Sequence, residues 1–433
     1  MTAHSRNLVG RLLNIERSEF GAALLSFIFV LILMASYYVL RPVRDAMASD
    51  WSDVELSWLW TLNFFISGGA VLAYGWIASR LTPARLVPAV YFFFAASFCL
   101  FYLATQSLED TRLLDKAFYI WVSFFALFHV SVFWSFMSGL YNSAQSKRLF
   151  GLFSAGASIG ALLGPLIPVL LSERLGVYNL MLLAALMLIL VVPIILRLER
   201  YHPESRGEIP ASFDNPLGGN FIAGFVDLLC HRFLLAIALF LLLYTMMSTF
   251  VYFELKNVMA EYDRAARAQY WGFMDLAVNT LSILAAVFVT GRLATRYGLA
   301  ITLALIPVLL VFGWLAVAMV PTLLLLIGLQ IVRRAGNYAI TRPGREMLFT
   351  RVAPETRFKT KPVIDIVVYR GGDVLAGWTY TGLAQGIGLG LGSIALVASG
   401  LALLWTLVAV FLGISYENNP GGAPAAAANL SET

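Results

Sequence analysis

Long apolar stretches, separated by short polar segments, run along almost the whole chain. A membrane-spanning helix needs about 20 predominantly apolar residues, and twelve stretches reach or approach that length. The expected spans are Phe20–Leu40, Ser57–Ser79, Leu86–Ala104, Ala117–Leu140, Leu149–Leu171, Tyr178–Leu196, Phe233–Phe253, Gln269–Thr290, Leu299–Met319, Thr322–Thr341, Pro362–Ala384 and Gly388–Gly413. The pattern predicts an all-α membrane protein with about twelve transmembrane helices.

A repeat relates the first six spans to the last six. The run SYYVLRPVRDAMA, which begins at Ser36, returns as STFVYFELKNVMA at Ser248, an offset of 212 residues. A second echo aligns Asn63 with Asn279, an offset of 216. Two halves that run in the same direction are typical of transporters that rock about a central site. We therefore expect two six-helix pseudo-symmetric bundles with a substrate site at mid-membrane.

Five regions follow from this organisation. They are an N-terminal interfacial segment (1–19), an N-terminal six-helix bundle (20–196), a cytoplasmic linker (197–232), a C-terminal six-helix bundle (233–413) and a disordered C-terminal tail (414–433). The first segment is mildly amphipathic, and the tail is of low complexity.

Charge is scarce and unevenly distributed. Only 13% of residues are charged, whereas 60% are hydrophobic. Lys and Arg concentrate in the loops on the side of the N-terminus, which by the positive-inside rule predicts that both termini are cytoplasmic. This bias accounts for the net charge of +5 without a nucleic-acid partner. Membrane lipids are the expected surroundings, and we expect the protein to function as a monomer.

Motifs for hydrolytic or cofactor chemistry are missing from the sequence. There is no GxxxxGK[ST] phosphate loop, and four His residues without ligand-like spacing predict neither a metal site nor a haem. The two Cys residues imply no disulfide framework. We therefore expect no cofactor and no enzyme activity, which leaves a secondary transporter driven by gradients or by exchange.

Charged residues inside the spans are the candidates for binding, because each costs at least about 2.5 kcal/mol at the bilayer centre unless it is paired or hydrated. The candidates are Asp275, Arg333, Arg334, Arg370 and Asp373. Internal ion pairs that lock two helices together would explain any one of them. Taken together, they favour a basic, water-filled cavity that accepts an anionic small-molecule substrate.

Four further candidates close the first and seventh spans, namely Arg41, Arg44, Glu254 and Lys256. Arg44 and Lys256 are equivalent in the repeat and are expected to face each other. The alternatives are charges anchored at the membrane surface, or pairing of Arg44 with Asp45 or Glu254 in a purely structural role. Pro42 is expected to break the helix after Arg41.

Two other features are interpreted as structural. Gly156, Gly160 and Gly164 recur every fourth residue and are expected to let the fifth span pack closely on a neighbour. His129 stands alone among apolar residues. It is expected to be a hydrogen-bonded core residue, and a proton site is the alternative.

Two loops carry a resemblance to the major facilitator superfamily. The segments GWIASR and GRLATR each place Gly five residues before Arg, like the loop signature of that superfamily. The acidic residue that usually precedes this Arg is replaced by Ser79 in one copy and Thr295 in the other. This departure argues against an ordinary drug/proton antiporter.

A closer resemblance is to the ATP/ADP antiporter (nucleotide transporter) family of plastids and intracellular bacteria and to its bacterial relatives. The similar segments are YYVLRPVRDAMA, QSKRLFGLFSAGASIGALLGP, YWGFMDLAVNTLSILAAVFVTGRLATRYG and RRAGNYAITRPGREMLFTRVAPETRFKTKPVIDIVVYRGGD. The resemblance implies a twelve-helix major-facilitator-like fold, a bacterial inner membrane and nucleotide exchange.

The resemblance carries over to individual residues only in part. Arg44 occupies the place of a basic residue that the family uses, and Glu254 corresponds to a Glu late in the seventh span. The fourth span contains no acid where the family has a Glu. Asp373 falls near the place of a basic residue in the eleventh span, unless Arg370 substitutes for it. These departures argue against strict ATP/ADP exchange.

The sequence thus predicts a secondary transporter that works by alternating access on an anionic solute, for which a nucleotide is one candidate. One alternative is a proton-coupled major-facilitator transporter of a non-nucleotide solute. The other is a membrane sensor that uses the same fold without moving solute.

Overall fold

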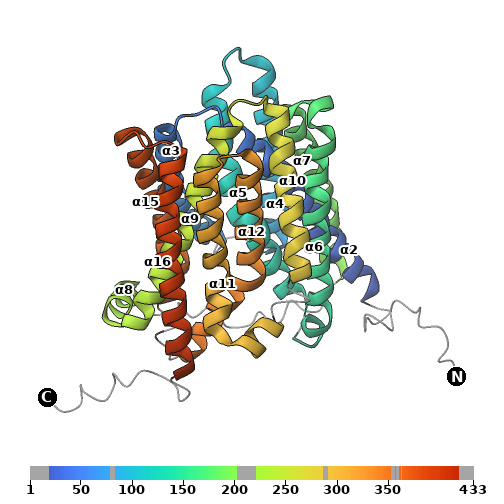
Figure 1. Cartoon of the computed structure of the whole chain (residues 1–433). Helices are drawn as coiled ribbons and strands as arrows, with labels where there is room; N and C mark the ends of the chain where they lie inside the picture. Colours follow the sequence, from blue (N-terminus) through green and yellow to red (C-terminus); the bar gives the residue numbers. More distant parts are fainter. Residues whose placement is uncertain are drawn as a thin grey trace. The chain divides into compact units, whose positions relative to one another are not determined.

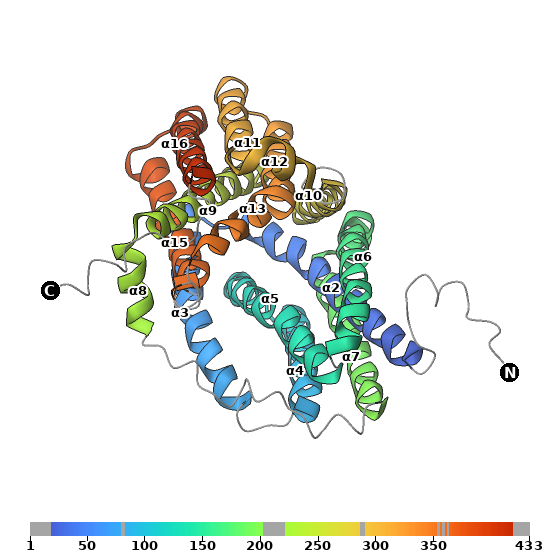
Figure 2. The ribbon, with the colours of Figure 1, turned by 90° about the horizontal axis from the view of Figure 1, so that it is seen from below.

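The structure, a computed structural model, describes residues 19–78, 83–141, 143–201, 221–285, 291–352, 356, 360–361 and 363–418. Helices account for nearly all of these residues, and no strand occurs among them. The chain folds into two compact units (Figures 1 and 2). The all-α prediction is confirmed.

The described residues of the first six expected spans each lie within one long helix. These helices are α2 (Phe20–Ala48), α3 (Asp53–Ala78), α4 (Pro83–Ser107), α5 (Arg112–Leu140), α6 (Ser143–Leu175) and α7 (Val177–Tyr201). Uninterrupted apolar sequence makes each of them long enough to cross a bilayer.

The second half repeats this arrangement with more interruptions. Its elements are α8 (Phe221–Cys230), α9 (Arg232–Met259), α10 (Arg264–Ala285), α11 (Gly291–Met319), α12 (Leu323–Gly336), η4 (Asn337–Thr341), α13 (Arg342–Leu348), η5 (Phe349–Arg351), η6 (Val363–Val368), α15 (Tyr369–Thr381), η7 (Gly382–Gly386) and α16 (Leu391–Asn418). The elements η4, η6 and η7 are π-helical turns that adjoin α12 and α15. Such turns occur mostly within longer helices and often at functional sites.

Nine helical segments within the described part of the chain are long and apolar enough to span a membrane. The described residues of the other expected spans lie in α3, in α10 and in α15 with its flanking π-turns. The eighth of these segments, Leu323–Arg351, joins α12 to α13 through η4.

Each compact unit takes one segment from the opposite half of the sequence. Unit 1 comprises Met1–Trp51, Phe65–Asn215 and Ala260–Asn279, whereas unit 2 comprises Ser52–Phe64, Pro216–Met259 and Thr280–Thr433. The exchanged segments are the beginnings of α3 and α10, which contain Asn63 and Asn279 of the second sequence echo. The exchange is therefore reciprocal between repeat-equivalent helices. The bundle boundaries at 20–196 and 233–413 stay a prediction.

The glycine stripe of α6 packs directly on α2, as the sequence predicts. A Cβ atom added at Gly160 would lie 2.3 Å from the carbonyl oxygen of Leu31, and one added at Gly164 would lie 2.7 Å from that of Ala35. Gly156 makes a similar approach to the carbonyl oxygen of Phe27. The small residues thus hold the two backbones of unit 1 close together.

The expectation that Pro42 breaks the first helix is wrong. The α2 helix continues through Pro42 to Ala48. The fixed φ of proline suits a helix, so the cost is a lost backbone hydrogen bond and some crowding. Packing offsets that cost, because α2 lies against α5, α6 and α7 within unit 1 (Figure 2), and Val39 and Val43 on either side of Pro42 are fully buried.

The ends of the predicted regions are only partly described. The predicted interfacial segment lies outside the described residues except for Glu19, which is buried and accepts a hydrogen bond from Arg148. Within the predicted linker, the short helix α8 precedes α9. The last helix extends to Asn418, five residues beyond the expected end of its span, and the rest of the predicted tail lies outside the described residues.

Candidate functional site

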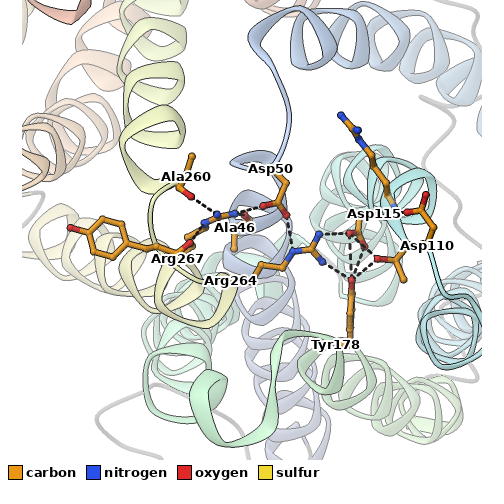
Figure 3. Close-up of polar contacts among 11 residues, drawn as sticks. Ala46, Asp50, Asp110, Asp115, Tyr178, Ala260, Arg264 and Arg267 are labelled. Atoms are coloured by element: carbon orange, nitrogen blue, oxygen red, sulfur yellow. Dashed lines mark hydrogen bonds and ion pairs between the residues drawn. The ribbon is translucent and has the colours of Figure 1, made fainter.

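A polar network joins the end of α2 to the beginnings of α5, α7 and α10 within unit 1 (Figure 3). Its members, which we call the loop-end network, are Asp50, Asp115, Tyr178, Arg264 and Arg267. Arg264 lies between two acids, with its nitrogens 2.7 Å from Asp50 and 2.8 Å from Asp115. Tyr178 also accepts a hydrogen bond from Arg264 and donates one to Asp115.

Arg267 completes the loop-end network. It pairs with Asp50 and donates to the backbone carbonyl of Ala260 (Figure 3). Because Asp115 is only 1% exposed, its charge depends on the partners supplied by α10 and α7. The network therefore joins residues that precede the linker in the sequence to residues that follow it.

A second contact of this kind, which we also call a tie because an acid–base pair joins two helix ends, lies in unit 2. The ammonium group of Lys256 on α9 is 2.7 Å from the carboxylate of Asp53, the first residue of α3, and both side chains are buried. Asn257 and Gln385 donate to the other oxygen of Asp53. Glu254 on the same helix is 2% exposed and lies within hydrogen-bonding reach of Tyr380.

The two ties are related by the sequence repeat. In unit 1, the first turn of α10 is bound to the acid that follows α2. In unit 2, the first residue of α3 is bound to a base in the last turn of α9. The charges are reversed between them. The predicted site residue Lys256 thus forms an ion pair with Asp53 inside unit 2, and its position opposite Arg44 stays a prediction.

The predicted basic residues at the end of α2 are also paired. Arg44 donates two hydrogen bonds to Asp45, at 2.9 and 2.6 Å, and lies over the ring of Tyr119. Arg41 is 3.6 Å from Asp275 and 3.7 Å from Asp45. The structure thus brings together two arginines and two aspartates whose formal charges cancel. Pairing of Arg44 with Asp45 is the alternative that the sequence left open.

His129 also has the contacts of a core residue. Its Nδ1 atom lies 3.0 Å from the carbonyl oxygen of Ala126, and its ring stacks on Tyr37 with centroids 4.4 Å apart.

A different arrangement surrounds Arg333 inside unit 2. Arg333 is 3% exposed, and its guanidinium donates to Gln330 at 3.1 and 2.7 Å and to the hydroxyl of Tyr244 at 3.4 Å. Both partners are neutral. Arg334, the next residue on α12, is equally buried.

The N-terminal part of α15 adds two charges and a ring to this arrangement. Tyr369 lies with its ring centroid 6.3 Å from that of Tyr244. Asp373 is within electrostatic range of Arg333 and Arg370. We call this set, which comprises Tyr244, Gln330, Arg333, Arg334, Tyr369, Arg370 and Asp373, the Arg333 cluster.

Arg370 and Asp373 are the members whose charges have no direct partner. Within the described part of the chain, neither makes a hydrogen bond or an ion pair shorter than 4.0 Å, although they are three residues apart on one helix. Both are half-buried. The Arg333 cluster thus combines three arginines with one aspartate, and two of the arginines, Arg333 and Arg370, can receive an anion without first breaking an ion pair.

Sequence reasoning missed the loop-end network and the acid that pairs with Lys256. These residues lie in short polar segments between spans, where charge is ordinary, so composition does not mark them. A usable signal was present: Asp50 and Asp53 follow the first copy of the repeat, and Arg264 and Arg267 follow the second. Acidic residues after one copy of the repeat and basic residues after the other indicate that ion pairs join the helix ends on which they lie.

The fold is shared with membrane transporters of known structure. The nucleoside transporter NupG superposes with a TM-score of 0.65 at 13% identity, over 92% of this chain and 99% of that one. The POT family transporter PepTSo gives 0.62 at 14% identity, over 92% and 98%. A bacterial homolog of the human lysosomal transporter Spinster gives 0.57 at 12% identity, over 93% and 97%.

Curated proteins offer no sequence match to this chain. The sequence pattern of the Major Facilitator Superfamily, however, matches residues 25–360, which is most of the chain. Together with the multi-pass helical fold, this match places the chain in the Major Facilitator Superfamily, as a secondary membrane transporter and not an enzyme.

Proposed function

We propose that the transported solute is an anion and that the Arg333 cluster binds it. The observation that carries the proposal is the buried guanidinium of Arg333, which is oriented by neutral Gln330 and Tyr244. A buried charge without a counter-charge is costly. A solute carboxylate or phosphate would supply that counter-charge and accept bidentate hydrogen bonds.

The paired residues of unit 1 are less suited to this role. Arg41 and Arg44 already contact Asp45 and Asp275, so an anion would have to displace a carboxylate. We therefore centre the proposed site on α12 and α15, and we assign the α2 arginines a supporting structural role.

A nucleotide exchanged for another nucleotide is the specific form of this proposal. It rests on the four sequence segments that resemble the ATP/ADP antiporter family and on the rings of Tyr244 and Tyr369, on which a base could stack. Because the proteins of similar fold include both a nucleoside transporter and peptide transporters, the fold leaves the solute open. We further propose a bacterial inner membrane location with both termini cytoplasmic.

Binding to purified protein tests the anion proposal. Thermal shifts would be recorded for wild type and Arg333→Gln with ADP, ATP, inorganic phosphate, dicarboxylates, nucleosides and dipeptides. Arg333→Gln should weaken anion binding by about 1.5–3 kcal/mol, the usual size for a hydrogen bond to a charged group. Arg174→Gln is the matched control, because Arg174 is exposed and has no ion pair in the described structure. Equal affinities in wild type and Arg333→Gln would rule the proposal out.

Flux in proteoliposomes decides between exchange and proton coupling. Exchange predicts that uptake of a labelled anion requires unlabelled solute inside and persists with an uncoupler. The proton-coupled alternative is favoured by Glu254, a buried carboxyl group with one oxygen that has no hydrogen bond among the described residues. It predicts uptake that follows an imposed pH gradient and disappears in Glu254→Gln.

A further inference from the structure

Arg370 and Asp373 on α15 indicate a property of the solute besides its negative charge. Several buried carboxylates of the described structure have a basic partner within 4.0 Å, namely Asp45, Asp53, Asp115 and Asp275. Within the described residues Asp373, like Glu254, has no basic partner at that distance, and Arg370, three residues before Asp373, has no acidic one. Two oppositely charged side chains thus lie three residues apart on one helix, and neither makes a hydrogen bond or an ion pair among the described residues.

Both charges are on the protein-facing side of α15. Arg370 and Gly377 are seven residues apart and share a helix face. A Cβ atom at Gly377 would lie 3.2 Å from Ser57 and 3.7 Å from Phe253, so that face packs against other helices of unit 2. The exposed Leu375 lies on the opposite face. Contact with lipid therefore does not explain why Arg370 stays half-exposed.

Asp373 keeps part of its side chain accessible on the protein-facing side of α15. It is half-buried, and so is Tyr369, which precedes it by one turn. A partly accessible carboxylate that has no ion pair among the described residues is available to a solute group.

Close packing keeps the pair in place. A Cβ atom at Gly372 would lie too close to the hydroxyl oxygen of Thr245, so the backbone of α15 approaches α9 closely at the residue just before Asp373. Thr245 is on the same helix as Tyr244, whose hydroxyl accepts a hydrogen bond from Arg333 and whose ring lies beneath the Arg333 guanidinium. The carboxylate is thereby held on the same side of unit 2 as the arginines.

We propose that the solute is an anion that also carries a positively charged amine, with its acidic group on Arg333 and Arg370 and its amine on Asp373. This inference rests on the proposed function, because it places a second recognition element beside the same basic site. An ammonium group can donate up to three hydrogen bonds to carboxylate oxygens, and Asp373 is an acceptor with none used. A plain dianion would instead be repelled by Asp373.

Matched pairs of probes test this inference. Two pairs differ only in an ammonium group, namely glutamate with glutarate and 2-aminoethylphosphonate with ethylphosphonate. The third pair is ADP with inosine diphosphate, whose base has a carbonyl group and an N1 proton in place of the neutral exocyclic amine. Dissociation constants would be measured on purified full-length protein. In wild type, at least one ammonium-bearing member should bind about tenfold or more tightly than its partner, the size expected of one charge-assisted hydrogen bond.

Substitution of the aspartate should remove that preference selectively. Asp373→Asn should bring the ratio within a pair to about 1–3, and Asp373→Glu, which keeps the charge, should retain most of it. Arg333→Gln should weaken both members alike and leave the ratio intact. A preference that survives in Asp373→Asn would overturn the inference, and so would a panel in which no amine-bearing probe binds more tightly than its partner.

Failure of the inference and failure of the proposed function give different results. If glutarate or phosphonate binding depends on Arg333 while Asp373 has no effect, the site takes a simple anion and only the amine is wrong. If ADP alone shows the preference, the recognised group is a neutral exocyclic amine, and the charged-amine inference is again wrong. If no probe responds to Arg333→Gln, the anion proposal falls as well.

Discussion

The loop-end network and the Arg333 cluster use similar side chains in opposite ways. In the first, Arg264 has two carboxylates and a tyrosine around it, and Arg267 has a carboxylate and backbone carbonyls. In the second, Arg333 has a glutamine and a tyrosine, and Arg370 has no hydrogen bond or ion pair among the described residues. Saturated charges hold helices together, whereas unsaturated charges are available to a solute.

The difference shows that the presence of charge does not identify a binding site. Arg41, Arg44 and Lys256 are as unusual in an apolar sequence as Arg333, yet each contacts an acid. What distinguishes Arg333 and Arg370 is the chemistry of their neighbours. The comparison therefore predicts opposite effects on stability when members of the two sets are replaced.

The largest effect is expected at the buried tie of unit 2. Lys256→Met leaves the carboxylate of Asp53 buried without its ammonium partner, which should lower the free energy of unfolding by about 3–5 kcal/mol. Denaturant unfolding in mixed micelles measures this change. The double variant Asp53→Asn with Lys256→Met removes both charges and should recover most of the loss. A single variant as stable as wild type would show that the pair is not a structural tie.

The opposite sign is expected in the Arg333 cluster. Replacing Arg370 by Gln and Asp373 by Asn together removes two unpaired charges from a membrane span, so the free energy of unfolding should rise by about 1–3 kcal/mol while solute binding is lost. Arg345→Gln is the control: Arg345 lies 3.1 Å from Asp365, so its replacement should lower stability instead. A destabilised double variant would mean that the α15 charges contribute to folding.

A smaller effect is expected from a single hydroxyl group of the loop-end network. Tyr178→Phe keeps the ring but removes the hydrogen bonds to Thr111, Asp115 and Arg264. The loss should be about 0.5–1.5 kcal/mol, because the buried Asp115 keeps its ion pair with Arg264. The thermal midpoint in detergent reports the change, with Tyr262→Phe, an exposed tyrosine, as the control. Equal shifts in both variants would remove Tyr178 from the network.

The smallest effect is expected at the exposed edge of the same network. The side chains of Asp50 and Arg264 are 29% and 34% exposed, so water and salt screen their attraction. Asp50→Asn should cost below about 1 kcal/mol, and the difference from wild type should shrink between low and high salt. A cost that is large and independent of salt would show that Asp50 acts as a buried residue, through its contact with Arg267.

Most of the helical framework could be predicted from the sequence. Apolar length located the spans, the repeat related α2 to α9 and α3 to α10, and the spacing of Gly156, Gly160 and Gly164 indicated the close contact of α6 that the structure shows with α2. These features are local, since they depend on residues within a few turns of one another. The effect of Pro42 was not predictable in this way, because packing by α5, α6 and α7 keeps its helix intact.

The sequence by itself thus determined that the chain is a multi-pass helical membrane protein, that its two halves are related by a repeat, and that a few charged residues lie within its apolar spans. Only the tertiary structure decided which of those charges are paired. Asp50 and Arg264 are 214 residues apart in the chain, and Asp50 and Arg267 are 217 apart. Burial of apolar side chains follows from composition and period. The electrostatic free energy of a charged group depends instead on which atoms lie within a few ångströms of it. Only the folded chain brings those atoms together.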